Sequence, residues 1–299
     1  MNEVYHIPAL LKETIEGLNI HKEGIYVDVT FGGGGHSRAI LKADAGHLYS
    51  FDQDVDALRN AIEDERWTFV HSNFRYLRNW MDYYGVEGID GLLADLGVSF
   101  HHFDCPERGF SFRFSAPLDM RMNQTAKRTA ADIVNGYSEE ELAKIFYLYG
   151  ELKNGRQIAK NICKARSQKA IERTEELVAA SRIPAEMSKE LARLFQALRI
   201  EVNDEMGALR EMLVAARDLL KPGGRIAILT YHSLEDRLVK NFLRSGNLEG
   251  TIEKDFYGNN LSPFTLIEKG REASEEEVER NPRARSAKLR VAEKLKIKN

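Results

Sequence analysis

Four consecutive glycines, residues 32–35, follow an apolar, β-branched run and precede a helix-like pattern in VDVTFGGGGHSRAIL, residues 27–41. Glycine lets a backbone approach a ligand closely, and the first turn of a helix exposes unpaired N–H groups. Open α/β sheets bind their ligands at the carboxyl ends of parallel strands. The stretch therefore predicts a strand, a ligand-binding turn and a helix within an α/β fold.

Short, nearly continuous apolar runs recur along the chain, as expected of parallel strands that are covered on both faces. Helical or loop segments separate them, and this alternation predicts a doubly wound, mostly parallel sheet. The predicted strands are 24–31, 47–52, 67–74, 89–99 and 225–233, and the predicted helices beside them are 9–18, 37–44, 54–65 and 206–219.

The alternation stops in the middle of the chain, where helical patterns such as SEEELAKIFYLYG and SKELARLFQALRIEVNDE replace it. The sheet pattern resumes after KPGG, a combination that ends helices and forms turns. We therefore expect residues 1–104 and 205–299 to form one α/β domain. Residues 105–204 are expected to form a helical insertion between its fourth and fifth strands.

The formal net charge of −3 hides a basic end. Residues 280–299 contain eight Lys and Arg against one acid, about +7, which indicates either a solvated terminal helix or tail or a nucleic-acid contact. The two cysteines form no CxxC pair, so we expect no metal site. No run approaches the ~20 apolar residues of a membrane helix, so we expect a cytoplasmic protein without membrane contact.

The glycine turn matches a dinucleotide motif only in part. Gly32 and Gly34 form a G-x-G, but Ser37 occupies the place of the third glycine. Asp52 ends the second predicted strand, where a carboxylate suits a ribose diol. Both NAD and S-adenosylmethionine fit this much of the pattern, and a tight turn without a ligand is the structural alternative.

Two further strand ends favour S-adenosylmethionine. Asn73 and Phe74 follow the third strand, where an amide and an aromatic ring could hold an adenine, although core packing also explains Phe74. Asp95 follows the apolar GLLA of the fourth strand, where burial without a role would be costly. Successive strand ends that carry Gly, Asp, Asn-Phe and Asp are typical of a methyltransferase site.

Motifs along almost the whole chain resemble those of the bacterial ribosomal RNA small-subunit methyltransferase H family. They are HIPALL (6–11), TFGGGGHSRAIL (30–41), FDQD (51–54), DLGVS (95–99), ERGFSFRF (107–114), PLDMRMN (117–123), FQALRIEVNDE (195–205), KPGGR (221–225), HSLEDRLVK (232–240) and NPRARSAKLR (281–290). The resemblance implies a Rossmann-like class I methyltransferase whose helical insertion recognises RNA. It also implies methylation by S-adenosylmethionine of the N4 amine of a specific cytidine in the decoding region of 16S rRNA.

The same resemblance implies which residues bind the cofactor and which partners the protein has. A family glutamine falls on His102, because this chain reads DLGVSFHHFD, and a histidine can still form the hydrogen bond. The implied substrate is 16S rRNA in an assembled or nearly assembled small subunit, and a homodimer is an open possibility. The implied cofactor contacts are Gly34, Gly35, His36, Asp52, Phe74, Asp95 and His102.

Transfer to an exocyclic amine benefits from an acceptor for the amine proton. Many amino-methyltransferases carry a D/N/S-P-P-Y/F motif after the fourth strand, and DLGVS stands there instead. We predict that Asp95, or a backbone carbonyl near it, is the acceptor; the alternative is that Asp95 only binds the cofactor. His232, at the end of the fifth strand, is a second candidate catalytic residue that would line the substrate site; the alternative is that it is a structural histidine. Ser233 and Asp236 after it match a helix capping box.

Aromatic and basic side chains supply candidate RNA contacts. A target base must leave its stack to reach the cofactor, so an aromatic ring could receive it, or such rings could plug the seam between the domains. Basic side chains could bind phosphates. The aromatic candidates are Phe100, Phe103, Phe110 and Phe112, and the basic candidates are Arg108, Arg113, Arg121, Arg283 and Arg285.

Two other functions remain open from the residues. An NAD-dependent oxidoreductase would need a third glycine and a proton relay, and the chain supplies neither convincingly. A non-catalytic RNA-binding module on a methyltransferase fold would explain the altered SFHH segment, residues 99–102, but not the intact glycine turn, Asp52 and Asp95.

Overall fold

The computed structural model describes residues 8–98 and 105–295. The chain divides into two compact units. The first, which we call the sheet unit, is Met1–Gly97 with Gly207–Asn299, and the second, the helical unit, is Val98–Met206.

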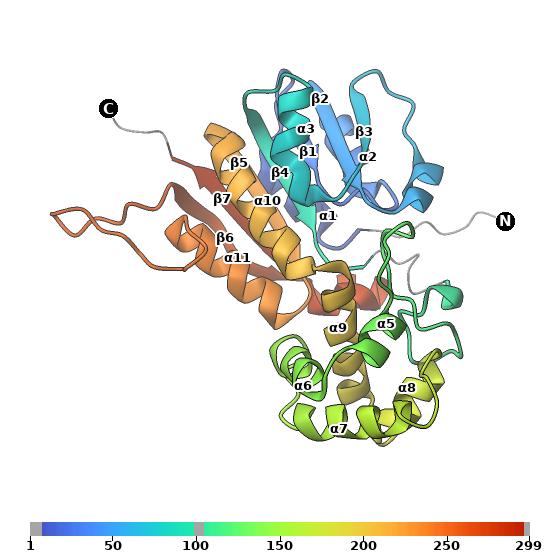
Figure 1. Cartoon of the computed structure of the whole chain (residues 1–299). Helices are drawn as coiled ribbons and strands as arrows, with labels where there is room; N and C mark the ends of the chain where they lie inside the picture. Colours follow the sequence, from blue (N-terminus) through green and yellow to red (C-terminus); the bar gives the residue numbers. More distant parts are fainter. Residues whose placement is uncertain (1–7, 99–104, 296–299) are drawn as a thin grey trace. The chain divides into compact units, whose positions relative to one another are not determined.

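The sheet unit contains a seven-stranded sheet in the order β3-β2-β1-β4-β5-β7-β6 (Figure 1). The first five strands in the sequence are parallel, whereas β7 runs antiparallel to both β5 and β6. The predicted doubly wound, mostly parallel sheet is therefore confirmed. The strands are β1 Ile25–Asp28, β2 His47–Asp52, β3 Trp67–His71, β4 Ile89–Asp95, β5 Leu220–Thr230, β6 Phe264–Glu272 and β7 Lys288–Lys294.

Helices cover both faces of this sheet. Helices α1 and α2 pack together against one face, and α3 and α10 lie on the face toward the viewer in Figure 1. The strand order reverses between β1 and β4, which creates a switch point where ligands of open sheets bind. The helices are α1 Leu11–Leu18, α2 Gly35–Lys42, α3 Leu77–Tyr83, α10 Glu205–Leu219, α11 Ser233–Ser245 and α12 Glu275–Arg280, with 3₁₀ helices η1 Val55–Asn60, η2 Phe74–Tyr76 and η4 Pro282–Ser286.

The helical unit has a core of its own, in which Phe146, Leu194 and Leu198 are at most 1% exposed. Reciprocal capping boxes begin two of its helices, with Thr129 before α5 and Ser138 before α6. Its elements include η3 Pro106–Arg108, α5 Ala130–Gly136, α6 Glu139–Leu148, α7 Gly155–Arg166, α8 Thr174–Ser181 and α9 Ser188–Asn203.

Two local predictions are wrong. Within the basic end, Lys288–Lys294 is neither a solvated helix nor a tail, because it forms β7 between two other strands. The predicted helix 54–65 is only the 3₁₀ helix η1. The prediction that KPGG ends a helix is confirmed, because α10 ends at Leu219; KPGG itself lies at the start of β5, where a register shift opposite Ile89–Gly91 and a left-handed Gly223 accommodate it.

Candidate functional site

The glycine loop after β1 is fixed by side chains from other segments. The Gly32 amide donates to Oδ2 of Asp52 at 2.8 Å, and Asn60 Nδ2 donates to the Gly32 carbonyl at 3.0 Å. The Arg38 guanidinium donates to the carbonyls of Gly33 and Asn60, both at 2.7 Å. Asp52 therefore connects the end of β2 to the loop. Together these hydrogen bonds fix the conformation of the loop backbone.

Gly34 and Gly35 lie where a side chain does not fit. Gly34 has a φ of +74°, and a Cβ there would lie 2.5 Å from Nη1 of Arg38 and 2.9 Å from the Phe31 ring. A Cβ on Gly35 would lie 2.4 Å from Cγ of Pro8. Real Cβ atoms do not approach other atoms this closely, so the turn into α2 requires bare backbone here.

A buried carboxylate, Asp28, lies at the end of β1 beneath the loop. It accepts hydrogen bonds from Oγ of Ser37 at 2.6 Å and from the Thr30 amide at 3.0 Å. Burial raises the pKa of Asp28 to about 6, although these hydrogen bonds oppose the change, and the nearby Asp52 adds to it. Ser37, in the place of a third glycine, thus binds a carboxylate of the sheet.

Asp95 ends β4 at the switch point, where its amide donates to Oγ1 of Thr30 at 2.6 Å. Its Oδ1 accepts a hydrogen bond from the Tyr231 hydroxyl at 2.7 Å, and its Oδ2 lies 3.6 Å from Nδ1 of His36. The Asp95 side chain remains 22% exposed. Loop, β4 and β5 therefore converge on one carboxylate that solvent or a ligand can reach.

Electrostatics make this carboxylate easy to protonate. Burial raises the pKa of Asp95 to about 7, the Tyr231 hydrogen bond opposes that rise, and the charges of Asp28 and Glu235 add to it. Burial also lowers the pKa of His36 to about 4, so His36 is neutral and supplies no counter-charge. Its Nε2 is buried without a hydrogen-bond partner among the described residues. Asp95 thus changes its charge near neutral pH.

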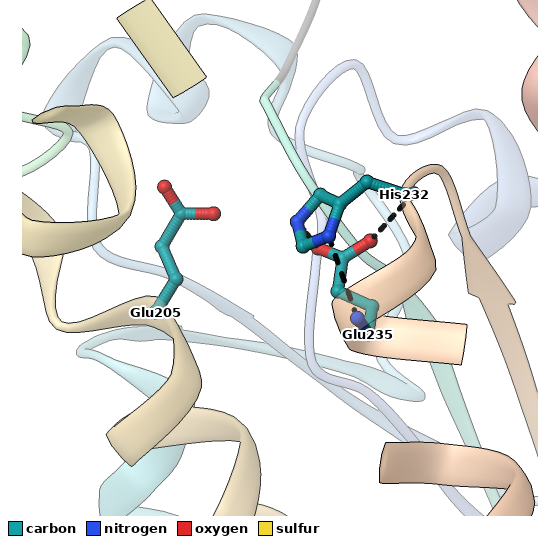
Figure 2. A group of neighbouring side chains, drawn as sticks. All are labelled: Glu205, His232 and Glu235. Atoms are coloured by element: carbon teal, nitrogen blue, oxygen red, sulfur yellow. Dashed lines mark hydrogen bonds and ion pairs between the residues drawn. The ribbon is translucent and has the colours of Figure 1, made fainter. Parts of the chain in front are cut away.

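His232 caps helix α11, and Figure 2 shows it against Glu235. Its Nδ1 accepts from the Glu235 amide, and the Glu235 carboxylate accepts from the His232 amide, both at 3.4 Å. The capping box predicted at Ser233 and Asp236 is therefore wrong by one residue. Asp236 instead binds the Arg290 guanidinium at 2.8 and 3.1 Å.

Glu235 links His232 to Asp95. Its buried carboxylate accepts from the Tyr231 amide at 3.0 Å, and its Oε1 lies 3.1 Å from Nε2 of His232, without the geometry of a hydrogen bond. Tyr231 in turn donates to Asp95. The two predicted catalytic residues thus lie at opposite ends of one polar chain, Asp95–Tyr231–Glu235–His232.

Phe74 is half-buried in η2 after β3. No hydrogen bond or ring contact joins it to the other predicted site residues that the structure describes. The neighbouring Asn73 caps η2 by accepting from the Arg75 amide, and it donates to Gln53 at 2.8 Å. Its side chain therefore has a structural use besides the predicted adenine contact.

Several of the predicted RNA-contact residues are buried or have structural partners. Phe110 is 5% exposed in the core of the helical unit, where Phe112 packs edge-on against Phe195. Arg108 donates to two backbone carbonyls, and Arg121 pairs with Asp119, so both have structural partners. The exposed basic candidates are Arg113, Arg283 and Arg285. The predicted residues that lie outside the described ranges are Phe100, His102 and Phe103.

The sequence reasoning missed the residues that hold the site in place. Arg38 and Asn60 position the glycine loop, and Tyr231 and Glu235 connect Asp95 to α11. The sequence indicates two of these residues only by their neighbours, because Arg38 follows the glycines and Tyr231 precedes His232.

A family model described as the MraW methylase family matches residues 3–295. The chain belongs to this family. A "Ribosomal RNA small subunit methyltransferase H" of Phocaeicola vulgatus is 60% identical over 302 residues, which cover 98% of each chain. A protein of the same name from Parabacteroides distasonis is 60% identical over 298 residues, 97% of this chain and 98% of the relative.

Among solved structures, an rRNA methylase from Streptococcus thermophilus is 15% identical with a TM-score of 0.43, over 97% of this chain and 99% of that one. A likeness this slight supports no inference about the chain. Family membership, in contrast, confirms the predicted methyltransferase and its cofactor, S-adenosylmethionine. In residues 8–98 and 105–295, no helix combines the length and apolar character needed to cross a membrane.

Proposed function

We propose that this chain methylates the N4 amine of a specific cytidine in the decoding region of 16S rRNA. The observation that carries the proposal is the Asp95–Tyr231 pair at the switch point, directly beside the glycine loop. The relatives' name, ribosomal RNA small subunit methyltransferase H, supports the substrate class. Such a substrate places the protein in the cytoplasm, with the small ribosomal subunit as its partner.

The residues of the loop fit S-adenosylmethionine. Gly34 and Gly35 keep the loop as bare backbone that a ligand can approach closely, and the buried Nε2 of His36, which has no hydrogen-bond partner among the described residues, offers a polar contact. Asp52 is oriented by the Gly32 and Asp54 amides, and a carboxylate at this strand end suits ribose hydroxyls. We assign cofactor contacts to these residues and to Phe74, Asp95 and His102. The bound cofactor would supply an electrophilic methyl group on a sulfonium.

Asp95 is the residue we assign to the amine. The cytosine amine is a poor nucleophile because its lone pair is delocalised into the ring, so an acceptor that draws on an N–H helps the nitrogen to pyramidalise. Tyr231 orients the carboxylate through Oδ1, and a pKa of Asp95 of about 7 is close to the value that suits a general base at neutral pH. In this proposal, the carboxylate first accepts a hydrogen bond from the amine. It then takes up the proton that the amine loses when it is methylated.

His232 and the helical unit have supporting roles in the same proposal. His232 and Tyr231 line one hollow, and we assign this hollow to the substrate. The helical unit contains the exposed Arg113 and would recognise RNA around the target nucleotide. None of these roles requires a second copy of the chain, so the proposal applies to a monomer and to a homodimer.

The direct test uses ribosomal subunits from cells that lack this protein. The purified chain is incubated with labelled S-adenosylmethionine and either small or large subunits, and label in the rRNA is counted. We expect label in small-subunit RNA alone. Equal labelling of large subunits, or none in either, would contradict the proposal. A rise in the melting temperature of the protein with S-adenosylhomocysteine but not with NADH would show that the site binds the methyltransferase cofactor and not NAD.

A further inference from the structure

A hollow at the N-terminus of α11 lies beside the proposed site. Its walls come from α11, from the end of η4 and from the start of β7, which lie some fifty residues apart in the sequence. Its volume of about 390 Å³ is within the size range of ligand sites, ~300–1,000 Å³. The polar side chains on these walls include Ser233, Arg237, Lys240, Ser286 and Lys288.

Positive charge dominates this hollow. Arg237, Lys240 and Lys288 contribute cations, and its one acid, Asp236, is engaged by Arg290 in two hydrogen bonds. Lys288 also pairs with Glu272 at 3.0 Å. Lys240 is exposed, and within residues 8–98 and 105–295 it makes no hydrogen bond or ion pair. The positive end of the α11 dipole adds to the attraction for an anion.

Neutral donors accompany these cations. Ser233 and Ser286 contribute hydroxyls. His232 also lines the hollow, with a side chain that is 9% exposed. Its Nε2 is buried and lies 3.1 Å from Oε1 of Glu235, so the donors we count in the hollow are the two hydroxyls and the three cations. Donors from three chain segments therefore surround one space, an arrangement that suits a tetrahedral anion better than a planar one.

The hollow is connected to Asp95 through a shared residue. Tyr231 lines the hollow, and its hydroxyl donates to Oδ1 of Asp95 at 2.7 Å. Among the residues that the structure describes, only Tyr231 thus connects an anion held in the hollow to the proposed acceptor. In RNA, the phosphates that flank a nucleotide are the anions closest to its base.

We propose that this hollow binds a backbone phosphodiester of the RNA substrate next to the nucleotide presented to Asp95. The inference rests on the proposed function for the identity of the RNA, but the phosphate chemistry follows from the hollow itself. Lysine is well suited to such a contact, as a point charge that holds a phosphate without reading the base. Lys240 is the residue whose contribution can be isolated, because its removal breaks no contact within the described chain.

The test measures methylation of small subunits at several salt concentrations with Lys240→Gln, Lys240→Arg and the control Lys22→Gln. Lys22 is an exposed lysine in the turn before β1. Lys240→Gln should raise KM for subunits about tenfold at low salt and leave kcat unchanged, since a phosphate contact positions the substrate without acting on the amine. The slope of log KM against log salt should fall by about 0.7, the value for one contact to a single strand. Lys240→Arg should retain most of the affinity.

Equal kinetics for Lys240→Gln and Lys22→Gln would overturn the inference. If wild-type protein does not methylate subunits, the proposed function fails, and the hollow is then tested alone by fluorescence anisotropy with a labelled single-stranded RNA. Weaker binding and a lower salt slope for Lys240→Gln support the hollow; no binding by wild type, or no difference between variants, overturns it. A raised KM on subunits with unchanged binding to naked RNA would assign the hollow to an acidic ribosomal protein instead.

Discussion

The hydrogen bond from Tyr231 to Asp95 offers the sharpest test of the proposed chemistry. Tyr231→Phe removes a 2.7 Å O–H donor from a carboxylate and leaves the ring in place. Hydrogen bonds to charged groups contribute about 1.5–3 kcal/mol, and 1.36 kcal/mol corresponds to a tenfold change in a proton-binding constant. The pKa of Asp95, about 7 in the intact protein, should therefore rise by about 1 to 2 in the variant.

This change predicts a specific pH–rate profile. At pH 7 the ionised fraction of Asp95 should fall from about one half to roughly a tenth or less, so kcat should fall about fivefold or more. The loss should shrink as the pH rises toward 9. The assay is single-turnover methylation of small subunits with saturating S-adenosylmethionine between pH 6 and 9. Tyr83→Phe, at a 75% exposed tyrosine of α3, is the matched control.

An unchanged midpoint of the pH–rate profile in Tyr231→Phe would show that this hydrogen bond does not set the pKa of Asp95. A uniform loss at every pH would do the same, because it would show that Tyr231 acts through structure and not through the ionisation of Asp95. Equal melting temperatures of the variant and the wild type at pH 7 would show that the fold is intact.

Three further predictions concern the same loop and its carboxylates. Because burial raises the folded-state pKa values of Asp28 and Asp95, the folded protein holds their protons more tightly than the unfolded chain does, and the free energy of unfolding should fall as the pH rises from 4 to 7. Asp28→Asn should lessen that fall by about 3 kcal/mol in urea titrations, and a fall identical to that of the wild type would contradict the assignment. Affinity for S-adenosylmethionine, by calorimetry, should rise several-fold from pH 6 to 8, and more than affinity for the uncharged thioether S-adenosylhomocysteine, since ionised Asp95 attracts a cation; equal pH dependence would argue against it. Gly34→Ala should weaken S-adenosylmethionine binding more than tenfold, whereas Gly85→Ala, which has a similar φ of +69° but open space around its Cβ, should cost only about 1–2 kcal/mol of stability and leave binding intact.

Much of the fold could be predicted because parallel strands covered on both faces are simple apolar runs. Val27, Leu92 and Leu93 are fully buried, as such runs require. Strand β7 escaped prediction because its charged residues resemble a solvated tail. In the fold, Arg290 is only 9% exposed and is neutralised by Asp236, 54 positions away, a pairing that no local pattern reveals.

The site could be predicted where local chemistry determines it. The glycines and the acids at the ends of β2 and β4 follow from the sequence, since a strand end beside a loop needs no knowledge of distant contacts. Their electrostatics could not be predicted. The charge state of Asp95 depends on Tyr231 and Glu235, which approach it only because β5 lies next to β4. The actual cap of α11 was also hidden, because His232 is a less common cap than the serine that follows it.

The identity of the modified nucleoside decides whether this chain methylates a cytosine amine. Small-subunit RNA methylated by the purified protein is digested and analysed by mass spectrometry against synthetic standards, with Asp95→Asn in parallel. We expect N4-methylcytidine at one site with the wild type, and a loss of that product with Asp95→Asn that is larger than any loss of its affinity for S-adenosylhomocysteine. A methyl group on cytosine carbon, on ribose or on another base would contradict the account.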